Sequence, residues 1–515
     1  MSLLLIFALF LCTIHSNHSA RILAYVPSSS YSHQIPFRPL WKELSLRGHQ
    51  VTFLTAVPIN DATLTNLTEI NLNFTAPLAF EIFSKVKESN LLKAIKLVYD
   101  GYSTNIDHQL QHHEVQKLLH GDEKFDLVIA EYLTLIPFAF AEKFKCPSIA
   151  VTSLEPTDIG YEIFGVPTHP IAYPTFVMPF SKTETLFQRI ISVTFNFFFK
   201  LFTELYDYKQ QDAIVRKHFG KNFPTVLELS EKISLLLENV EPILSKIRPR
   251  VPATIPVGGI LHVPAKPLPK ELQKVLDSSS NGFIYFSFGS VIRSDHLSND
   301  LLKVVMDTFA ELPYTVLCKF KPGTFSNVPK NVFLANWVPQ ADVLKHPNIK
   351  LFITHGGRQS SEEAVFAKVP ILGIPQTFDQ PKNIRTMVEQ GFGLSLDYKT
   401  LNKHEFKEAI MEVTTNPSYR NAISRMSDLI QDQPMSGLDR AVWWVEYVIR
   451  HKGAGHLRSP VLDIPFYQYY LIDVIAVFIA TFLIIITGLV LMSRAMYKIF
   501  KFFFKKSIPV KLKKQ

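Results

Sequence analysis

The stretch WVPQADVLKHPNIKLFITHGGRQSSEEAVFAKVPILGIPQTFDQ, residues 337–380, carries the clearest structural signal in this chain of 515 residues. Its segment LFITH predicts an apolar strand that ends at His355, and Gly356 and Gly357 predict a tight turn directly after it. A helix is expected next, followed by a second short strand over residues 369–374. Strand, turn, helix and strand form a βαβ unit, which indicates an α/β fold with a parallel sheet.

Polar residues in this stretch gather beyond the ends of the two predicted strands. Ser360 and Glu363 fall in the first turns of the expected helix, and Asp379 and Gln380 follow the second strand. Open α/β sheets bind their ligands beyond the carboxyl ends of the strands. Backbone N–H groups at a helix start hold phosphate, and glycines let that backbone approach it closely. The stretch therefore predicts a nucleoside diphosphate site with a polar group beyond it.

Outward from this unit, the chain predicts two Rossmann-like domains on either side of a proline-rich linker at residues 248–271. Residues 283–291 (FIYFSFGSV) are the expected first strand and turn of the second domain. Short β-rich runs at 21–26 and 50–55 flank a helical segment and open the first domain. His33 lies in the loop after the first run, so it is expected at the carboxyl edge of the sheet, pointing into a crevice. A further apolar strand, residues 125–131, ends in Glu131.

The two ends of the chain are expected to lie outside these domains. Residues 1–16 are an apolar run followed by small polar residues, which is typical of a cleaved signal peptide, assigned to residues 1–19. Residues 474–492 carry no charge and are long enough to span a bilayer as a helix. Only basic charges follow, which places that flank in the cytoplasm. We therefore expect a single-pass type I protein with lumenal domains.

The net charge of +9 originates in the C-terminal tail. The tail holds eight of the 54 basic residues and none of the 45 acidic ones, so the remainder balances at 46 against 45. The basic balance therefore indicates membrane orientation, and nucleic-acid binding loses its support. Of the three cysteines, Cys12 lies in the signal peptide, and Cys146 and Cys318 fall in different predicted domains. Neither a disulfide framework nor a metal cluster is expected.

Residues 187–202 (FQRIISVTFNFFFKLF) are strongly apolar, yet Arg189 and Lys200 bracket only ten uncharged residues, too few to span a membrane. We expect a core helix there, with an interfacial helix resting on the lumenal leaflet as the alternative.

Two short patterns concern processing and retention. Asn66 and Asn73 begin N-x-Thr acceptors, which are expected to be glycosylated in a lumenal chain. The final residues KLKKQ resemble the dilysine retrieval signal of endoplasmic-reticulum membrane proteins, although any basic tail can produce this spacing by chance.

The motif WVPQ…HGG…S..E…DQ within residues 337–380 resembles the signature of the UDP-dependent glycosyltransferases of small lipophilic acceptors. The segment DQPMSGLDRAVWWVEYVIRHKGAGHLR, residues 432–458, the membrane helix and the lysine tail are similar to the animal microsomal branch, the UDP-glucuronosyl- and UDP-glucosyltransferases. The resemblance runs from the signal peptide to the tail. It implies an α/β fold of two facing Rossmann-like domains (GT-B type) plus a C-terminal transmembrane helix.

The resemblance also implies a role for each polar residue of the second domain. Trp337 would stack on uracil, and Gln340 would bond the nucleoside. The diphosphate would be held by Ser290, His355, Ser360 and the backbone of Gly357. Glu363 would accept hydrogen bonds from the ribose hydroxyls. Asp379 and Gln380 would bind the sugar. Taken singly, each has an ordinary interpretation, such as a buried core Trp, a capping His, a solvated helix carboxylate or a simple turn.

His33 matches the catalytic base of the family. An acceptor hydroxyl must lose its proton as it attacks the anomeric carbon, and a histidine accepts a proton near neutral pH. UDP then leaves, so the resemblance implies a single inverting displacement that needs neither a covalent intermediate nor a metal or other cofactor. The family places an Asp beside this histidine to orient it. This chain has Glu131 there, one methylene longer.

Other departures from the family pattern are Lys368 in place of Gly, Gln359 in place of Asn, and Cys318 in place of Trp. Lys368 is expected either to disturb the turn at the helix end or to add a cation near the diphosphate. Arg358 and Lys368 are the candidates for pairing with a sugar carboxylate, which leaves the choice between UDP-glucuronate and UDP-glucose open.

The expected segments are a signal peptide (1–19), an acceptor-binding domain (20–250), a UDP-sugar-binding domain (251–415), a helical segment that packs back on the domains (416–472), a transmembrane helix (473–493) and a basic tail (494–515). The expected function is an inverting transfer of a glucuronosyl or glucosyl group to small lipophilic acceptors at the endoplasmic-reticulum membrane. The alternative is a catalytically weak UDP-sugar-binding partner subunit. A homo- or hetero-oligomer remains open. A UDP-sugar epimerase fits less well, because it needs no membrane helix.

Overall fold

The computed structural model describes residues 19–506, apart from residues 88, 176–177, 179, 181–182, 246, 290–297, 324, 326 and 378. Ser290, most of the predicted signal peptide and the lysine-rich end therefore lie outside the described residues. The chain divides into two compact units, Met1–Arg458 and Ser459–Gln515. Each is described by itself.

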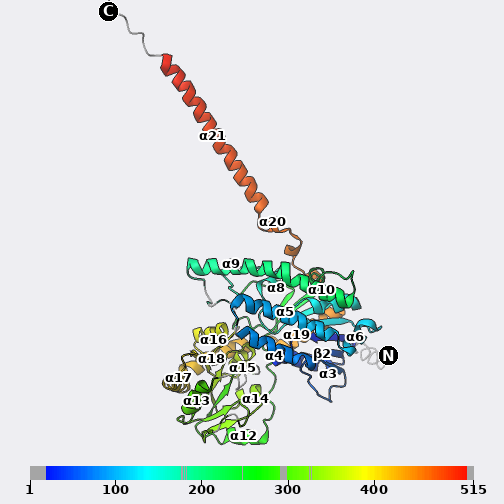
Figure 1. Ribbon diagram of the computed structural model, residues 1–515, viewed down its shortest axis with the longest axis vertical. Helices are drawn as coiled ribbons and strands as arrows, with labels where there is room; N and C mark the ends of the chain where they lie inside the picture. The colour runs from blue at the N-terminus through cyan, green and yellow to red at the C-terminus, as the bar shows by residue number, and fades with distance from the viewer. Residues whose placement is uncertain are drawn as a thin grey trace, which may run out of the picture. The chain divides into compact units, whose positions relative to one another are not determined.

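The first unit contains two parallel β-sheets, each flanked by helices (Figure 1). The first sheet has seven strands in the order β3-β2-β1-β4-β5-β6-β7. They are β1 (Arg21–Val26), β2 (Gln50–Thr55), β3 (Leu67–Asn71), β4 (Leu127–Glu131), β5 (Ser148–Thr152), β6 (Ile233–Glu238) and β7 (Thr254–Pro256). Every residue of β4 and β5 is buried, as expected for strands covered by helices on both faces.

The second sheet has six strands in the order β10-β9-β8-β11-β12-β13. They are β8 (Phe283–Ser287), β9 (Thr315–Cys318), β10 (Val332–Leu334), β11 (Ile349–Thr354), β12 (Ile371–Gly373) and β13 (Gly393–Ser395). In the first sheet β1 lies between β2 and β4, and in the second sheet β8 lies between β9 and β11. The chain therefore builds each sheet first on one side of its starting strand and then on the other. In sheets with this order, ligands bind beyond the carboxyl ends of the strands where the order reverses, which here are β1 with β4 and β8 with β11. The predicted pair of Rossmann-like folds is confirmed.

The helices around the first sheet are α2 (Tyr31–Gln34), η1 (Ile35–Phe37), α3 (Arg38–Leu46), η2 (Asn73–Thr75), α4 (Ala76–Lys87), α5 (Leu91–Leu110), α6 (His113–His120), η3 (Ile136–Phe138), α7 (Ala139–Phe144), α8 (Asp158–Glu162), α9 (Leu186–Phe202), η4 (Thr203–Asp207), α10 (Tyr208–Phe219) and α11 (Val226–Ser230). Those that follow β7 in the first unit are α12 (Lys270–Asp277), α13 (Asn299–Phe309), α14 (Gln340–Leu344), α15 (Arg358–Phe366), α16 (Gln380–Glu389), α17 (Lys403–Thr415), α18 (Pro417–Gln431), α19 (Gly437–His451) and η6 (Gly455–Leu457).

The proline-rich passage predicted as a linker is partly structured. It carries β7, which pairs with β6 in the first sheet, so the connection between the sheets begins after Pro256.

Helix α19 returns from the far end of the unit to the first sheet. Its buried residues Ala441, Val442, Val445 and Val448 share one apolar core with β1, β2 and α3. Gly437 at its start lies so close to the backbone of Gly258 that a β-carbon would not fit. The last helix of the unit thus completes the core of the first domain.

Helix α9 lies on the outer side of the first domain, where Figure 1 shows it as a long rod that leads into α10. The prediction of a core helix for residues 187–202 is wrong, since Ser192 is the one residue of α9 that is buried. Phe187, Phe197 and Phe198 are 71%, 62% and 58% exposed. Apolar density suggested a core, but only one side of the helix packs inward, through residues such as Phe199, while the exposed apolar residues recur at helical spacing on the outer side.

The second unit contains η7 (Pro460–Asp463), α20 (Phe466–Tyr469) and α21 (Ile472–Lys506). Residues Ile472–Phe504 of α21 are long and apolar enough to cross a membrane, and their most apolar stretch is not buried by any other described part of the chain. At about 1.5 Å per residue, such a helix exceeds the thickness of a hydrocarbon core.

Candidate active site

Three polar side chains meet at the carboxyl edge of the first sheet. His33 lies in α2, in the loop after β1; Glu131 is the last residue of β4; and Ser153 directly follows β5. The Nδ1 atom of His33 lies 2.7 Å from Oε1 of Glu131, and the Ser153 hydroxyl contacts both groups. Because these three strands are neighbours in the sheet, the fold brings residues 120 positions apart into contact.

The Glu131 side chain is completely buried, and His33 is 9% exposed. The extra methylene of Glu131, relative to the Asp of the family pattern, thus does not prevent direct contact with the histidine. The second carboxylate oxygen, Oε2, has no hydrogen-bond partner among the described residues. The carboxylate is therefore held at one oxygen, which fixes the imidazole while leaving part of the charge unsatisfied.

His355 occupies the corresponding position in the second sheet, directly after β11. Its ring fits between two glycines: a β-carbon on Gly289 would lie 2.7 Å from Cε1 of His355, and one on Gly357 would lie 2.9 Å from Nε2. Burial, together with the nearby Lys319, lowers the pKa of His355 to about 4. The imidazole is therefore neutral at physiological pH, and its buried Nδ1 has no partner among the described residues.

Trp337 follows β10 and is 54% exposed, so it is not the buried core residue that its ordinary interpretation would require. The ammonium group of Lys319 lies 4.5 Å from the centre of its ring. Tyr31 of α2 contacts the same ring edge-on, with the centroids 5.0 Å apart. Since Tyr31 is two residues from His33, this contact joins the histidine loop of the first domain to the donor stretch of the second.

Gln340, Ser360 and Glu363 form a connected group. The amide nitrogen of Gln340, the first residue of α14, donates to Oγ of Ser360 at 3.0 Å and to Oε2 of Glu363 at 2.6 Å. Burial, reinforced by the neighbouring carboxylate of Glu362, raises the pKa of Glu363 to about 7. This carboxyl group therefore titrates near neutral pH. Only above that pH is it mostly ionised, with both oxygens able to accept hydrogen bonds.

Asp379 and Gln380 lie in the loop after β12, at the start of α16. Asn383 donates to Oδ2 of Asp379 at 2.7 Å, and burial raises the pKa of this carboxyl. The side-chain oxygen of Gln380 accepts from the backbone N–H groups of Gln376 and Thr377 at 2.9 and 3.1 Å. That oxygen closes the loop, so the amide nitrogen is the part of Gln380 suited to a sugar hydroxyl.

The structure brings together His33 with Glu131, Gln340 with Ser360 and Glu363, and His355 with Gly357. Ser290 lies outside the described residues. The sequence reasoning missed Ser153, Tyr31 and Lys319. Ser153 had a usable signal, because it follows an apolar strand in the same way as His33 and Glu131 do.

The two cations proposed for a sugar carboxylate are engaged elsewhere. Lys368 adopts a left-handed backbone conformation with φ of 59° and pairs with Asp428 of α18 at 2.5 Å. The turn at the end of α15 is thus kept, and the lysine charge is directed to α18. Arg358 donates through Nε to the backbone oxygen of Asn239 at 3.1 Å, and through its terminal nitrogens to Ser245.

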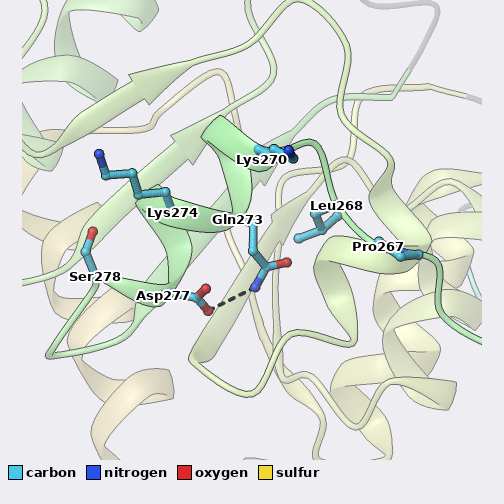
Figure 2. A pocket seen from close by; sticks show the side chains of 7 residues that line it. All are labelled: Pro267, Leu268, Lys270, Gln273, Lys274, Asp277 and Ser278. Carbon is cyan, nitrogen blue, oxygen red and sulfur yellow. Dashed lines mark hydrogen bonds between the residues drawn. The ribbon is translucent and has the colours of Figure 1, made fainter.

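A hollow of about 630 Å³ lies beside α12 (Figure 2). It is lined by Pro267, Leu268, Lys270, Gln273, Lys274, Asp277 and Ser278. None of the predicted donor residues lines it, and two of its polar lining residues pair with each other, Gln273 donating to Asp277 at 2.9 Å. We assign it no role in the reaction.

Comparison with known proteins places the chain in a family. Residues 21–509 match the family described as UDP-glucoronosyl and UDP-glucosyl transferase. The chain belongs to this family. It is therefore a UDP-glycosyltransferase, an enzyme that transfers a sugar from a UDP-sugar.

Relatives of the transferase align along nearly the whole chain. It is 34% identical to UDP-glucosyltransferase 2 of Dactylopius coccus, with 93% of each chain covered. It is 32% identical to UDP-glucuronosyltransferase 2B15 of Homo sapiens, with 92% of this chain and 93% of the human one covered. The ecdysteroid UDP-glucosyltransferase of Spodoptera littoralis nuclear polyhedrosis virus is 31% identical, with 92% and 96% covered.

Solved structures share the fold of the transferase at lower identity. The glycotransferase of kitacinnamycin superimposes with a TM-score of 0.58 at 19% identity, covering 84% of this chain and 99% of that one. The calicheamicin glycosyltransferase CalG4 gives a TM-score of 0.55 with the same identity and coverage. The GT-B fold expected from the resemblance is confirmed, and the comparisons do not support the alternative of a non-catalytic partner subunit.

Proposed function

We propose that the enzyme moves a hexosyl group from a UDP-sugar to small lipophilic alcohols, phenols or acids with inversion at the anomeric carbon. The observation that carries the proposal is the meeting of two sites: the His33–Glu131 pair of the first sheet and the donor stretch of the second, joined by the contact between Tyr31 and Trp337. An ecdysteroid glucosyltransferase among the relatives supports a lipophilic acceptor.

In this mechanism, Nε2 of His33 accepts the proton of the acceptor hydroxyl while the acceptor oxygen attacks the anomeric carbon. The bond from that carbon to the diphosphate oxygen breaks, and UDP leaves with the electron pair. Glu131 holds Nδ1–H and stabilises the imidazolium that forms. Attack opposite to the leaving group inverts the configuration. We assign no cofactor, since the UDP-sugar is a co-substrate and His33 supplies the activation.

Each donor residue keeps its proposed role. Trp337 and Gln340 bind the nucleoside, Glu363 binds the ribose, and Asp379 and Gln380 bind the sugar. The diphosphate is assigned to Ser290, His355, Ser360 and the Gly357 backbone. A neutral His355 can donate one hydrogen bond to a phosphate oxygen, and the start of α15 adds backbone N–H groups.

We propose glucose as the preferred sugar. Of the cations named for a glucuronate carboxylate, Arg358 is bonded to the first domain and Lys368 pairs with Asp428. Lys382, which lies near Gln380 on α16, pairs with Glu155 at 2.5 Å. Burial by itself would raise the pKa of Glu155, but the charges of Lys382 and Arg248 lower it to about 2. The Glu155 carboxylate is therefore ionised at neutral pH and keeps Lys382 paired.

The test is an assay of the purified enzyme in membranes with UDP-glucose and UDP-glucuronate against a panel of phenols. We expect kcat/KM for UDP-glucose to exceed that for UDP-glucuronate by at least about 10-fold, the cost of one unpaired buried charge. NMR of the product should show the β-anomer from an α-linked donor. Retained configuration would refute the single displacement, and a preference for UDP-glucuronate would refute the donor assignment.

The carboxyl of Glu363 makes donor binding pH-dependent. Ribose hydroxyls donate to the ionised form, so binding favours that form and weakens as pH falls below about 7. We expect the Kd of UDP-glucose, measured by calorimetry, to rise roughly 10-fold from about pH 8 to about pH 6. The Glu363→Gln variant should bind more weakly at high pH and show little change over this range. A wild-type Kd that does not vary would contradict the role of Glu363.

We further propose that α21 anchors the enzyme in the endoplasmic-reticulum membrane, with the domains in the lumen and the basic end in the cytoplasm. Asn73 is exposed, and Asn66 donates its amide to the backbone of Ser45 at 3.2 Å. In cells, Asn66→Gln and Asn73→Gln should each remove one endoglycosidase-sensitive step in gel mobility. An unmodified wild type, or protease digestion of the domains in sealed microsomes, would contradict this orientation.

A further inference from the structure

A hydroxyl group completes the His33–Glu131 pair. The Oγ atom of Ser153 lies 2.8 Å from Nδ1 of His33 and 2.6 Å from Oε1 of Glu131. Ser153 is completely buried, as is Glu131. The three groups form a closed triangle of hydrogen bonds beyond the ends of β1, β4 and β5.

The chemistry of the three groups sets the direction of these bonds. An ionised carboxylate can only accept hydrogen bonds, so Ser153 donates its proton to Glu131. The single Nδ1–H of His33 is then shared by Oε1 of Glu131 and the oxygen of Ser153, which requires the proton of the neutral imidazole to be on Nδ1. Nε2 is therefore the unprotonated nitrogen, the state that a base needs.

Ser153 is held in turn by the second domain. Gln359, the second residue of α15, donates its amide N–H to the backbone oxygen of Ser153 at 3.0 Å. Its neighbour Arg358 reaches the backbone oxygen of Asn239, which follows β6. Helix α15 begins with the residues assigned to the diphosphate. The first residues of α15 therefore face the donor and also donate hydrogen bonds to the backbone beyond two strands of the first sheet, β5 and β6.

We propose that Ser153 is a positioning residue that fixes the tautomer of His33, and that Gln359 keeps Ser153 in place from the donor-binding domain. The proposal rests on the function proposed above, in which His33 is the base. In consequence, hydrogen bonds through Gln359 and Ser153 connect the start of α15, at the diphosphate, to the imidazole of His33. The two domains must be docked through Gln359 for the base to be fully ordered.

Among the described residues, the titratable groups that face His33 are Glu131 at the end of β4 and Tyr102 of α5, whose ring centre lies 6.4 Å away. Burial, with a contribution from Glu131, holds the pKa of Tyr102 far above its usual range, so Tyr102 stays neutral. Changes in the pH profile on substitution of Ser153 are therefore expected to report on the triangle.

The first test replaces Ser153 with alanine. We expect kcat to fall about 10-fold with the KM for the UDP-sugar unchanged, since one hydrogen bond to a charged group is lost. The acid limb of the pH–rate profile should move to higher pH, because Glu131 no longer shares its charge with the hydroxyl and holds the proton on His33 more firmly. Ser153→Thr, which restores the hydroxyl, should recover both rate and profile. Ser278→Ala, at an exposed position, is the control.

The second test replaces Gln359 with leucine, which has a similar size but no donor. We expect kcat to fall about 5- to 10-fold while the Kd of UDP changes less than about twofold. In the Ser153→Ala background the same substitution should have little further effect, since there is no hydroxyl left to position. The proposal would be overturned if the losses in kcat from Ser153→Ala and Gln359→Leu were additive in the double variant. It would also be overturned if the acid limb of the Ser153→Ala profile did not move. If His33→Ala also retains full transfer, the proposed function fails instead.

Discussion

Replacing His33 with alanine is expected to lower kcat by about 10²- to 10⁴-fold, the usual contribution of a positioned general base. The Kd of UDP should stay within about twofold, because the residues assigned to the donor belong to the second sheet and do not depend on His33. Transfer is measured with UDP-glucose and a phenol, and UDP binding by calorimetry on the same preparation.

His404→Ala provides a matched control, since His404 is an exposed histidine on α17. It should transfer at the wild-type rate. A His33→Ala enzyme that still transfers sugar at the wild-type rate would remove His33 from the mechanism. One that loses both transfer and UDP affinity would indicate a wider loss of structure.

The second large effect is expected at Glu131. Glu131→Ala should lower kcat by about 10²- to 10⁴-fold, because His33 loses the group that orients it. Glu131→Asp should also be slower, by about 10-fold or more, although the family pattern has Asp there. The shorter side chain ends about 1.5 Å further from Nδ1, and the present distance is already 2.7 Å.

Glu131→Gln separates stability from activity. The buried carboxylate has one oxygen without a partner among the described residues, so loss of this uncompensated charge should offset the cost of the unpaired amide N–H, and Tm should change little. Activity should still fall strongly, because an amide can donate toward Nδ1 and favour the wrong tautomer. Glu142→Asp, which alters a surface ion pair, is the control for shortening a carboxylate. An active Glu131→Asp enzyme would show that the triangle tolerates a longer contact.

Much of the fold could be read from local pattern. The runs at 21–26 and 50–55 coincide with β1 and β2, because short apolar strands between turns leave little doubt about their ends. The rule that ligand residues follow parallel strands placed His33 correctly at the sheet edge. The same rule applied to residues 148–152 would have added Ser153.

The contacts between the two domains could not be predicted from the sequence. Nothing in the residue types of Gln359 or Tyr31 shows that they touch Ser153 and Trp337, because such contacts depend on how two separate folds dock. The core-helix prediction for α9 failed for a related reason. Composition reveals how apolar a helix is, but not whether another element covers its face. Lys368 shows a third limit, since its left-handed conformation is set by the turn and not by its own preference.

The position of α19 in the chain also affects how the first domain folds during synthesis. The first domain leaves its sheet at Pro256, yet the helix that fills part of its core starts at Gly437, about 180 residues later. At roughly 5–20 residues per second, the ribosome needs about 10–40 s to supply it. During that interval a nascent chain exposes an unfinished apolar surface to chaperones. For the same reason, chimeras that exchange acceptor specificity between relatives should transfer α19 together with the first domain.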